Sequence, residues 1–285
     1  MALWTPADET TALWLDNSDQ NTLFDATTGG SLVAPGGAIA RMEDKSGNAR
    51  HFTQSTLANR STWQTNQQNG LAVGRFDGGN DRFLGVTESR NIARAKPAIY
   101  VVAVVNPDTY VSNDAIFSIR TTTTTSRLLM TVESSSWRLG GRRLDSNTYA
   151  EIQFSTAGYD SWNLIGGLLD FSVGTSEAIR LFVNGSQVAN STLPGTSTLS
   201  SDSLSEGVTL GSFVTSNYFD GDIGEIIVLD YLPTLGLIQT FDGYLAHRWG
   251  IQSKLNASHP YRFSPPGAGA IDSRRRRFAL GGYGL

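Results

Sequence analysis

The chain has 285 residues, of which 39% are hydrophobic and 17% are charged. That hydrophobic content suffices for a full-sized core, and the low charge together with 30 glycines favours strands and tight turns over long solvated helices. The net charge of −4 excludes a general attraction to nucleic acid or anionic membranes, and the absence of cysteine excludes disulfides, thiolate zinc sites and thiol nucleophiles.

Residues 1–70 are polar and rich in turns, with isolated aromatic residues. We expect this segment to wrap around the same core as the rest of the chain. Within it, Thr5-Pro6 predicts a short capped helical start, and Leu13–Asp16 predicts a strand. The first residues have neither the basic nor the apolar stretch of a signal peptide, and no apolar run in the chain reaches the ~20 residues of a membrane span.

Residues 71–263 predict one β-sandwich. Residues 99–105 are a continuous β-branched run bounded by prolines, which is typical of a central strand buried on both faces. Asn184-Gly185 is a strong signal for a two-residue hairpin turn. Further strands are expected at residues 71–77, 82–86, 115–119, 128–132, 137–139, 149–154, 162–171, 178–183, 208–210 and 224–229. About ten short strands separated by turns predict an all-β antiparallel sandwich.

Residues 234–249 depart from the strand pattern. Apolar residues recur there at steps of three and four, which predicts an amphipathic helix with its apolar face on the sandwich. These residues are Leu235, Ile238, Phe241, Leu245 and Trp249. Residues 264–285 follow as a proline- and glycine-rich linker and an arginine-rich tail.

Two distant parts of the sequence, in this order, carry a family resemblance. The first part is residues 43–51 (EDKSGNARH), followed by Asn69-Gly70 and residues 76–78 (FDG). The second part is residues 220–228 (DGDIGEIIV), followed by residues 241–250 (FDGYLAHRWG) and 259–261 (HPY). Over roughly residues 3–266 the chain resembles the LamG-like, concanavalin A-like jelly-roll proteins of tailed bacteriophages.

The resemblance implies two antiparallel sheets packed face to face, with the terminal helix against one edge. It also implies that residues 247–249 (HRW) and 259–261 (HPY) form a latch between this helix and the sheet. The chain departs from the family at Met42, where tryptophan is frequent, and at Ser61, where proline is frequent. These departures affect local packing and turn rigidity.

The sequence gives little support to an enzyme. Asp222 and Glu225 come nearest to the carboxylate pair of a glycosidase, but their spacing places them on opposite faces of a regular strand. We therefore interpret Glu225 as an inward-facing structural acid that is hydrogen-bonded to a backbone bend or to an arginine. No Gly-x-Ser-x-Gly motif is present, and His247 and His259 are interpreted as packing residues. The chain is predicted to be non-enzymatic.

Binding residues are predicted of two kinds. Sugars stack on aromatic rings and hydrogen-bond to amides, and the residues that fit this chemistry are Trp63, Trp137, Asn217 and Tyr218. Asp77, Asn80 and Asp81 share one glycine-rich loop and offer oxygen ligands for calcium, which related LamG domains often hold at their rim. The alternative is that these three are ordinary turn residues. No cofactor is required by either interpretation.

The basic tail is predicted to dock on partner proteins rather than on specific nucleic acid. The docking residues are Arg274, Arg275, Arg276, Arg277, Phe278 and Leu280. Together with the resemblance, this predicts a structural protein of a phage virion, of decoration, fibre or tail-associated type, which stabilises the particle or adheres to surface glycans. Such a protein is made in the host cytoplasm, assembles as a homo-oligomer with other virion proteins and lies on the virion surface. The alternative is a secreted or cell-surface bacterial carbohydrate-binding module.

Overall fold

Two antiparallel β-sheets make up the body of the protein, whose computed structural model describes residues 2–108, 114–120, 126–155, 159–205 and 207–267. One sheet contains β1 (Leu13–Asp16), β5 (Thr62–Gln68), β6 (Leu71–Asp77), β8 (Ala98–Pro107), β13 (Asn163–Asp170), β14 (Ile179–Val183), β15 (Ser186–Ser191) and β17 (Asp220–Leu229). The other contains β2 (Leu23–Phe24), β3 (Arg41–Met42), β4 (Phe52–Thr53), β7 (Phe83–Gly85), β9 (Asp114–Arg120), β10 (Ser126–Glu133), β11 (Ser136–Gly141), β12 (Ala150–Ser155) and β16 (Gly207–Leu210). The predicted all-β antiparallel sandwich is confirmed.

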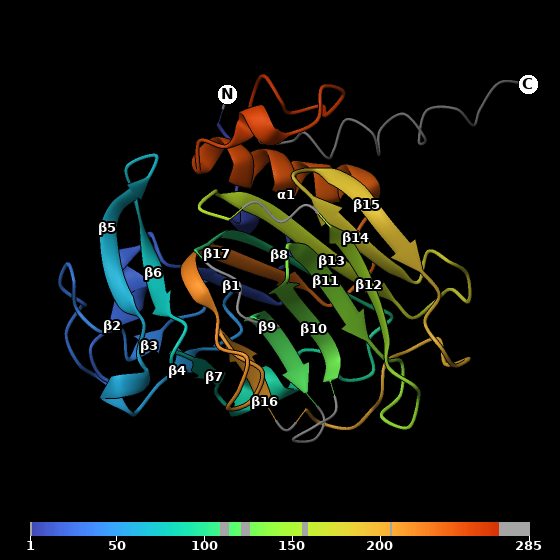
Figure 1. Cartoon of the computed structure of the whole chain (residues 1–285), viewed down its shortest axis with the longest axis horizontal. Coiled ribbons are helices and arrows are strands. Elements are labelled where there is room, and N and C mark those ends of the chain that lie inside the picture. Colours follow the sequence, from blue (N-terminus) through green and yellow to red (C-terminus); the bar gives the residue numbers. More distant parts are fainter. Residues whose placement is uncertain (1, 109–113, 121–125, 156–158, 206, 268–285) are drawn as a thin grey trace, which may run out of the picture.

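The strand order explains which residues can meet. The eight-stranded sheet runs β15-β14-β13-β8-β17-β6-β5, and β1 pairs with the second half of β17 (Figure 1). The nine-stranded sheet runs β12-β11-β10-β9-β16-β7-β4-β3-β2. Short 3₁₀ helices connect the strands, and they are η1 (Pro6–Asp8), η2 (Gln20–Thr22), η3 (Leu57–Asn59), η4 (Thr87–Asn91) and η5 (Gln252–Lys254).

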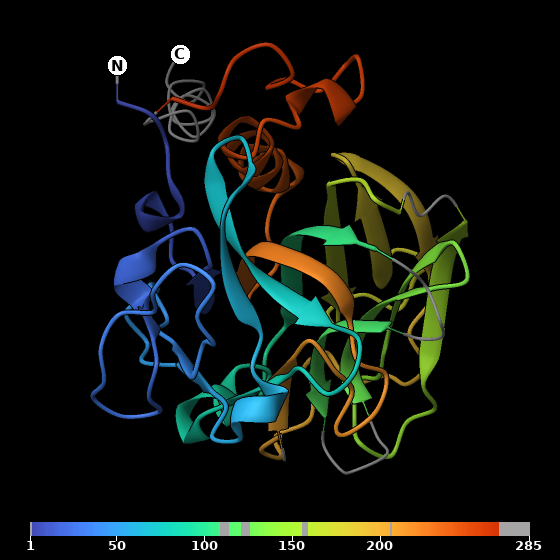
Figure 2. The same cartoon turned by 60° about the vertical axis from the view of Figure 1, so that its left-hand side comes forward.

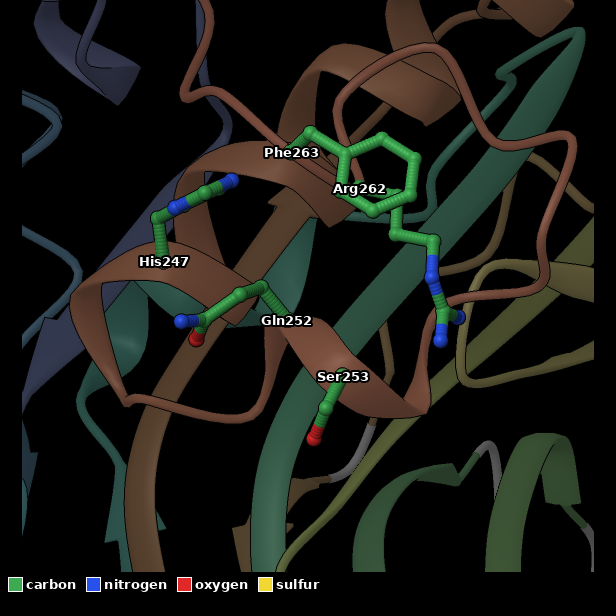
Figure 3. Close-up of a pocket in the computed structure, with 5 residues that line it drawn as sticks. All are labelled: His247, Gln252, Ser253, Arg262 and Phe263. Carbon is green, nitrogen blue, oxygen red and sulfur yellow. The ribbon is translucent and has the colours of Figure 1, made fainter.

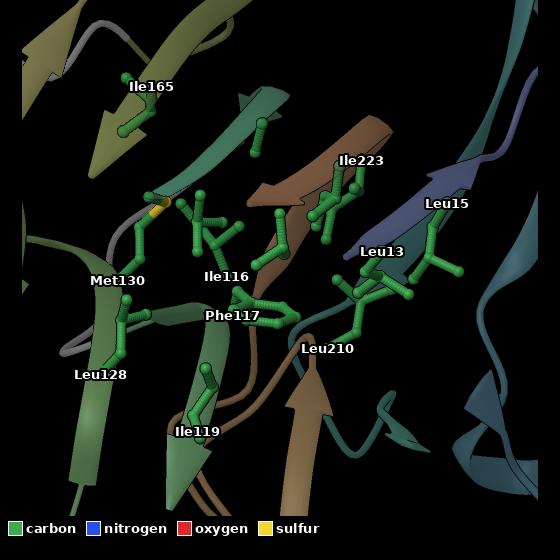
Figure 4. Packing of buried hydrophobic residues seen from close by; sticks show 14 of the residues in the cluster. Leu13, Leu15, Ile116, Phe117, Ile119, Leu128, Met130, Ile165, Leu210 and Ile223 are labelled. Carbon is green, nitrogen blue, oxygen red and sulfur yellow. The ribbon is translucent and has the colours of Figure 1, made fainter. Parts of the chain in front are cut away.

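The central strand β8 is buried on both faces, as its apolar run predicts. Alternate residues point toward the nine-stranded sheet, and we call this side the inner face; they include Val101 and Val105. The residues between them, such as Val102 and Val104, point to the outer face, which carries a second hydrophobic cluster. Figure 4 shows part of the inner cluster, in which residues of the nine-stranded sheet such as Phe117 pack between the sheets.

The helix α1 (Leu235–Arg248) begins where the sequence predicts, with Thr234 Oγ1 accepting a hydrogen bond from the amide of Leu237. It lies across the outer face of the eight-stranded sheet and not against one edge, so that expectation is corrected (Figure 1). The reason is that the outer face of β8 is apolar and has to be covered. Leu235 was also assigned to the buried face but is 61% exposed, because it lies in the first turn.

Two further segments enclose the helix. Residues 251–267, here called the C-terminal strap, run along its far side, where a Cβ at Gly243 would come 2.5 Å from Cβ of Tyr261. The β5–β6 hairpin rises to the C-terminal end of α1 (Figure 2), and the side chains of Gln68 and Asn69 donate to the last helical carbonyls. His247 Nε2 lies 2.7 Å from the carbonyl oxygen of Tyr261, which joins α1 to the strap. Trp249 donates to Glu225 of β17, and a Cβ at Gly185 would come 2.9 Å from His259, so both motifs of the predicted latch also contact the eight-stranded sheet.

The N-terminal 70 residues contribute to both sheets. Strand β1 pairs with β17, while β2, β3 and β4 extend the nine-stranded sheet. Leu13, Leu23 and Phe52 are fully buried in the inner cluster. None of the helices in the described ranges has the length and apolar character to cross a membrane.

Candidate functional site

Glu225 is enclosed beneath α1 and has no exposed surface. The indole nitrogens of Trp14 and Trp249 donate to its carboxylate at 2.7 and 3.0 Å, and Arg248 Nε lies 3.2 Å from Oε2. Burial and the charge of Asp16 raise the pKa of Glu225 to about 7, while Arg248 and the two indole donors oppose this rise. The carboxyl group is therefore structural and ion-paired with an arginine, as the sequence predicts, but it faces the outer cluster and not the space between the sheets, so that part of the prediction was wrong.

The expectation that Asp222 and Glu225 lie on opposite faces was wrong. The pairing of β17 with β8 shifts register between Ile223 and Glu225, so Gly224 is the extra residue of a β-bulge. Both carboxylates consequently lie on the outer face. They still do not form a catalytic pair, because Glu225 is inaccessible and Asp222 faces Arg75.

Carboxylates gather where β6 and β8 end and β17 begins. The guanidinium of Arg75 is bonded to Asp108 and lies 3.3 Å from Asp220 Oδ1 and 3.7 Å from Asp222 Oδ1. Asp77 is the register partner of Asp220. We call this end of the sandwich the acidic rim, which comprises Arg75, Asp77, Asp81, Arg82, Asp108, Asp220 and Asp222.

The structure brings two of the predicted glycan-binding residues, Asn217 and Tyr218, together with the loop of the predicted calcium ligands at this rim. Residues 211–219, between β16 and β17, pack beside residues 78–82, and the amide of Gly78 donates to the carbonyl of Phe219 at 3.2 Å. Arg82 donates to the Tyr218 hydroxyl at 3.0 Å, and its guanidinium carbon lies 5.7 Å from the ring centroid. Tyr218 and its neighbour Asn217 are half-buried. The aromatic ring thus has a fixed orientation at the edge of a polar surface.

Trp63 and Trp137 do not belong to a binding surface. Trp63 is 5% exposed and Trp137 is fully buried, both within the inner cluster. Strand alternation turns each ring inward, and Trp63 donates its indole N–H to the carbonyl of Asn17. A sugar cannot reach either ring, so the prediction of glycan stacking on these two residues is corrected.

Several residues of the rim were missed from the sequence. Arg82 and Asp108 lie in segments without a recognisable motif. Their proximity follows from the order β6-β17-β8, which places strands together that are far apart in the chain. The polar pair Asp220 and Asp222, two residues apart at the start of a strand, was the local signal available.

The predicted calcium ligands behave as turn residues in this conformation. Asp77 Oδ1 accepts from the amide of Gly79 at 2.8 Å, and Asp81 Oδ2 accepts from the amide of Asp77 at 3.2 Å. In the described part of the chain no three acidic, histidine or cysteine residues are arranged to hold a metal ion. Calcium binding by Asp77, Asn80 and Asp81 stays a prediction, tested by following the thermal midpoint during calcium titration.

Asp81 gives the rim a pH dependence. Burial and the charge of Asp77 raise the pKa of Asp81 to about 7. Because the folded protein binds this proton more tightly than the unfolded chain, whose pKa is near 4, Asp81 contributes its full stability below pH 4. That contribution is lost as the pH rises to 7 and above. We expect Asp81→Asn to be more stable than the wild type at pH 8, because asparagine carries no charge to bury beside Asp77. The gain should be about 1–2 kcal/mol, since solvent at exposed Asp77 screens part of the repulsion. At pH 5 the difference should be smaller, because Asp81 is then protonated in the folded protein and ionised only in the unfolded chain. Urea denaturation at both pH values measures this, and an equal difference at pH 5 and pH 8 would contradict it.

A shallow pocket of about 290 Å³ lies elsewhere, between the end of α1 and the C-terminal strap (Figure 3). His247, Gln252, Ser253, Arg262 and Phe263 line it. None of the predicted binding residues is among them. It contains neither a carboxylate pair nor an activated nucleophile, so it offers no catalytic arrangement.

No protein-family model and no curated protein matches this sequence. Among similar solved structures is the binding domain of botulinum neurotoxin DC in complex with rat synaptotagmin II, with a TM-score of 0.55 and 14% identity over 84% of this chain and 52% of that chain. Another is botulinum neurotoxin type C, whose cell entry depends on two ganglioside molecules, with a TM-score of 0.57 and 12% identity over 84% of this chain and 52% of that chain.

A third similar structure is the ligand-binding domain of botulinum neurotoxin serotype D in complex with N-acetylneuraminic acid, with a TM-score of 0.56 and 11% identity over 83% of this chain and 51% of that chain. The chain therefore spans about half the length of the solved structures it matches. At this level of identity the likeness establishes the fold, which is the predicted concanavalin A-like jelly-roll sandwich with a helix packed on it.

Proposed function

We propose that the chain is a non-catalytic glycan-binding module whose site is the acidic rim together with Asn217 and Tyr218. The observation that carries the proposal is the oriented ring of Tyr218, held by Arg82 beside carboxylates on a neighbouring loop. An aromatic face with hydrogen-bonding groups around it is what a pyranose ring requires. The fold is also that of domains that bind N-acetylneuraminic acid and gangliosides in other proteins, which supports binding over catalysis.

In this proposal each residue has a distinct task. The ring of Tyr218 stacks on the apolar face of a sugar. The guanidinium of Arg82 fixes the ring by its hydrogen bond and by lying over its π-face, so little side-chain entropy is lost on binding. The Asn217 amide and the exposed Asp77 carboxylate offer hydrogen bonds to sugar hydroxyls. No bond is broken, so long incubation with bound polysaccharide should leave it unchanged.

We predict that Tyr218→Ala weakens glycan binding by about tenfold, because the stacking surface is removed. Tyr218→Phe keeps the ring and loses the hydroxyl bond to Arg82, so it should weaken binding by no more than about threefold. The matched control is Gln153→Ala, an exposed change on β12 of the other sheet. Binding is measured on immobilised oligosaccharides with each variant checked for folding. Normal binding by folded Tyr218→Ala would contradict the site.

We further propose that the module is displayed as a homo-oligomer on the surface of a phage virion and is anchored by its tail. The resemblance in residues 43–51 and 220–228 supports this, as does the basic and apolar composition of the tail. The docking residues predicted for it lie outside the described residues, and they are Arg274, Arg275, Arg276, Arg277, Phe278 and Leu280. The rival role of a secreted bacterial carbohydrate-binding module requires no particle.

We predict that removing residues 270–285 leaves the sandwich folded but abolishes incorporation into particles. The described contacts that close the C-terminal strap end at Gly267, which bridges to Leu3, so they are retained in the truncated chain. Incorporation is measured by quantifying the protein in purified particles, with circular dichroism as the folding control. Truncated protein present at normal copy number would contradict the anchoring role.

A further inference from the structure

We infer that the acidic rim selects neutral and amino-bearing glycans and discriminates against sialylated ones. This inference rests on the proposed function and specifies its ligand class. The domains of similar fold include one in complex with N-acetylneuraminic acid, an anionic sugar, so the inference separates this chain from them. It is argued from the charges and hydrogen-bonding groups that surround Tyr218.

The charge balance at the rim is negative. Asp77, Asp108, Asp220 and Asp222 are gathered there with two arginines, while the raised pKa of buried Asp81, about 7, leaves that carboxyl mostly protonated at pH 6. The side chains of Asp108 and Asp220 are 29% and 24% exposed, so they face solvent in part. An approaching carboxylate would meet a negative potential, whereas an ammonium group would be attracted.

Both arginines of the rim already have partners within the protein. Arg75 is bonded to Asp108 and lies within 4 Å of Asp220 and Asp222, so its positive charge is already shared. Arg82 is engaged by the hydroxyl and the ring of Tyr218. Bidentate recognition of a carboxylate requires a guanidinium edge, and a sialic acid carboxylate would have to compete with three aspartates for that of Arg75.

The rim also has more acceptors than donors. The Asp222 side chain is only 9% exposed, and its Oδ1 has no hydrogen-bond donor, its nearest cation being Arg75 at 3.7 Å. Oδ1 of the adjacent Asn106 is likewise buried without a donor. These buried oxygens add to the negative potential of the rim, which favours a ligand that brings donors or positive charge over one that brings a carboxylate.

Matched oligosaccharide pairs test the inference. The first pair is the trimer of N-acetylglucosamine and the trimer of glucosamine, measured at pH 6, where the amines are charged. The second pair is lactose and 3′-sialyllactose. At low salt we expect the amine trimer to bind about tenfold more tightly than the acetylated trimer, and sialyllactose to bind about tenfold more weakly than lactose. Both ratios should shrink toward one at about 0.5 M salt, because the exposed charges are screened.

A pair of isosteric variants locates the source of the preference. Asp77→Asn removes one charge from the rim and keeps the oxygen that accepts from Gly79. Glu151→Gln removes one charge from β12 on the other sheet, where Glu151 pairs with Arg138. We expect Asp77→Asn to reduce the preference for the amine trimer about threefold, and Glu151→Gln to leave it unchanged.

The outcomes separate the inference from the proposed function. Sialyllactose binding as tightly as lactose, or an amine trimer without preference, overturns the charge selection and leaves glycan binding in place. Equal effects of Asp77→Asn and Glu151→Gln overturn the assignment to the rim. Failure of all four sugars and of a wider neutral panel to bind removes the proposed function, and the inference with it.

Discussion

Replacing Trp249 by alanine should lower the free energy of unfolding by about 3–5 kcal/mol. Trp249 is fully buried at the end of α1 and stacks on Trp162, with ring centroids 5.6 Å apart and an interplanar angle of 21°. It also donates to Glu225 Oε2 at 3.0 Å. Alanine therefore leaves a cavity and removes a donor from a buried carboxylate, and both effects destabilise the native state. Urea denaturation followed by circular dichroism measures the loss.

The variant Trp249→Phe separates these two effects. Phenylalanine retains most of the buried volume but has no indole N–H for Glu225, so we expect about half of the alanine effect. The sheet side of the same contact is tested by Gly224→Ala, whose Cβ would come 2.5 Å from the Trp249 ring. An unchanged melting temperature in Trp249→Ala would mean that α1 does not depend on this contact with the sheet.

Local patterns were sufficient to predict the main elements. The strand β8 was identified because continuous β-branched residues bounded by prolines have few alternatives, and α1 because its apolar residues follow helical spacing with Thr234 as N-cap. The turn at Asn184-Gly185 was identified because asparagine and glycine are the residues that most readily take positive φ. Both do so in the structure, at 49° and 76°. Each of these signals lies within a few neighbouring residues.

Contacts between distant segments were not predictable in the same way. Strands β2, β3 and β4 have two residues each, too few to show a period. The bulge at Gly224 reverses the facing of every later residue of β17, and it lies against the bulky ring of Trp249, 25 residues further along the chain. The faces of Asp222 and Glu225 were mispredicted for this reason.

The candidate site illustrates the same limit. Asn217, Tyr218, Asp77 and Asp81 were selected by residue type, and the sheet order then placed their loops side by side. Trp137 was selected by residue type too. Side chains of β11 alternate between the two faces of the sheet, which turns the Trp137 ring inward and leaves the neighbouring Arg138 partly exposed. The apolar character of β8 on both sides did imply a covering layer on the outer face, and this was a stronger argument for the position of α1 than the family resemblance.

At the opposite end of β8 from the rim, Arg143→Met should lower the free energy of unfolding by about 3–5 kcal/mol. The Arg143 side chain is buried, and its guanidinium donates to four backbone carbonyls in two loops. The accepting residues are Phe171, Val173, Leu193 and Ser197. Methionine fills much of the same volume but leaves these carbonyls without donors in a buried place.

The matched variant Arg143→Lys tests whether geometry or charge stabilises the two loops. A lysine ammonium is a compact point charge and cannot reach carbonyls on two sides as the planar guanidinium of Arg143 does. We therefore expect a loss of about 2–3 kcal/mol in the free energy of unfolding. Glycan binding by the folded fraction should be unchanged in both variants, because residues 171–173 and 193–197 connect strands at the end of the sandwich remote from Tyr218. Loss of less than 1 kcal/mol in Arg143→Met would show that other contacts hold these loops. Loss of glycan binding without loss of stability would instead place this end of the sandwich in the binding site.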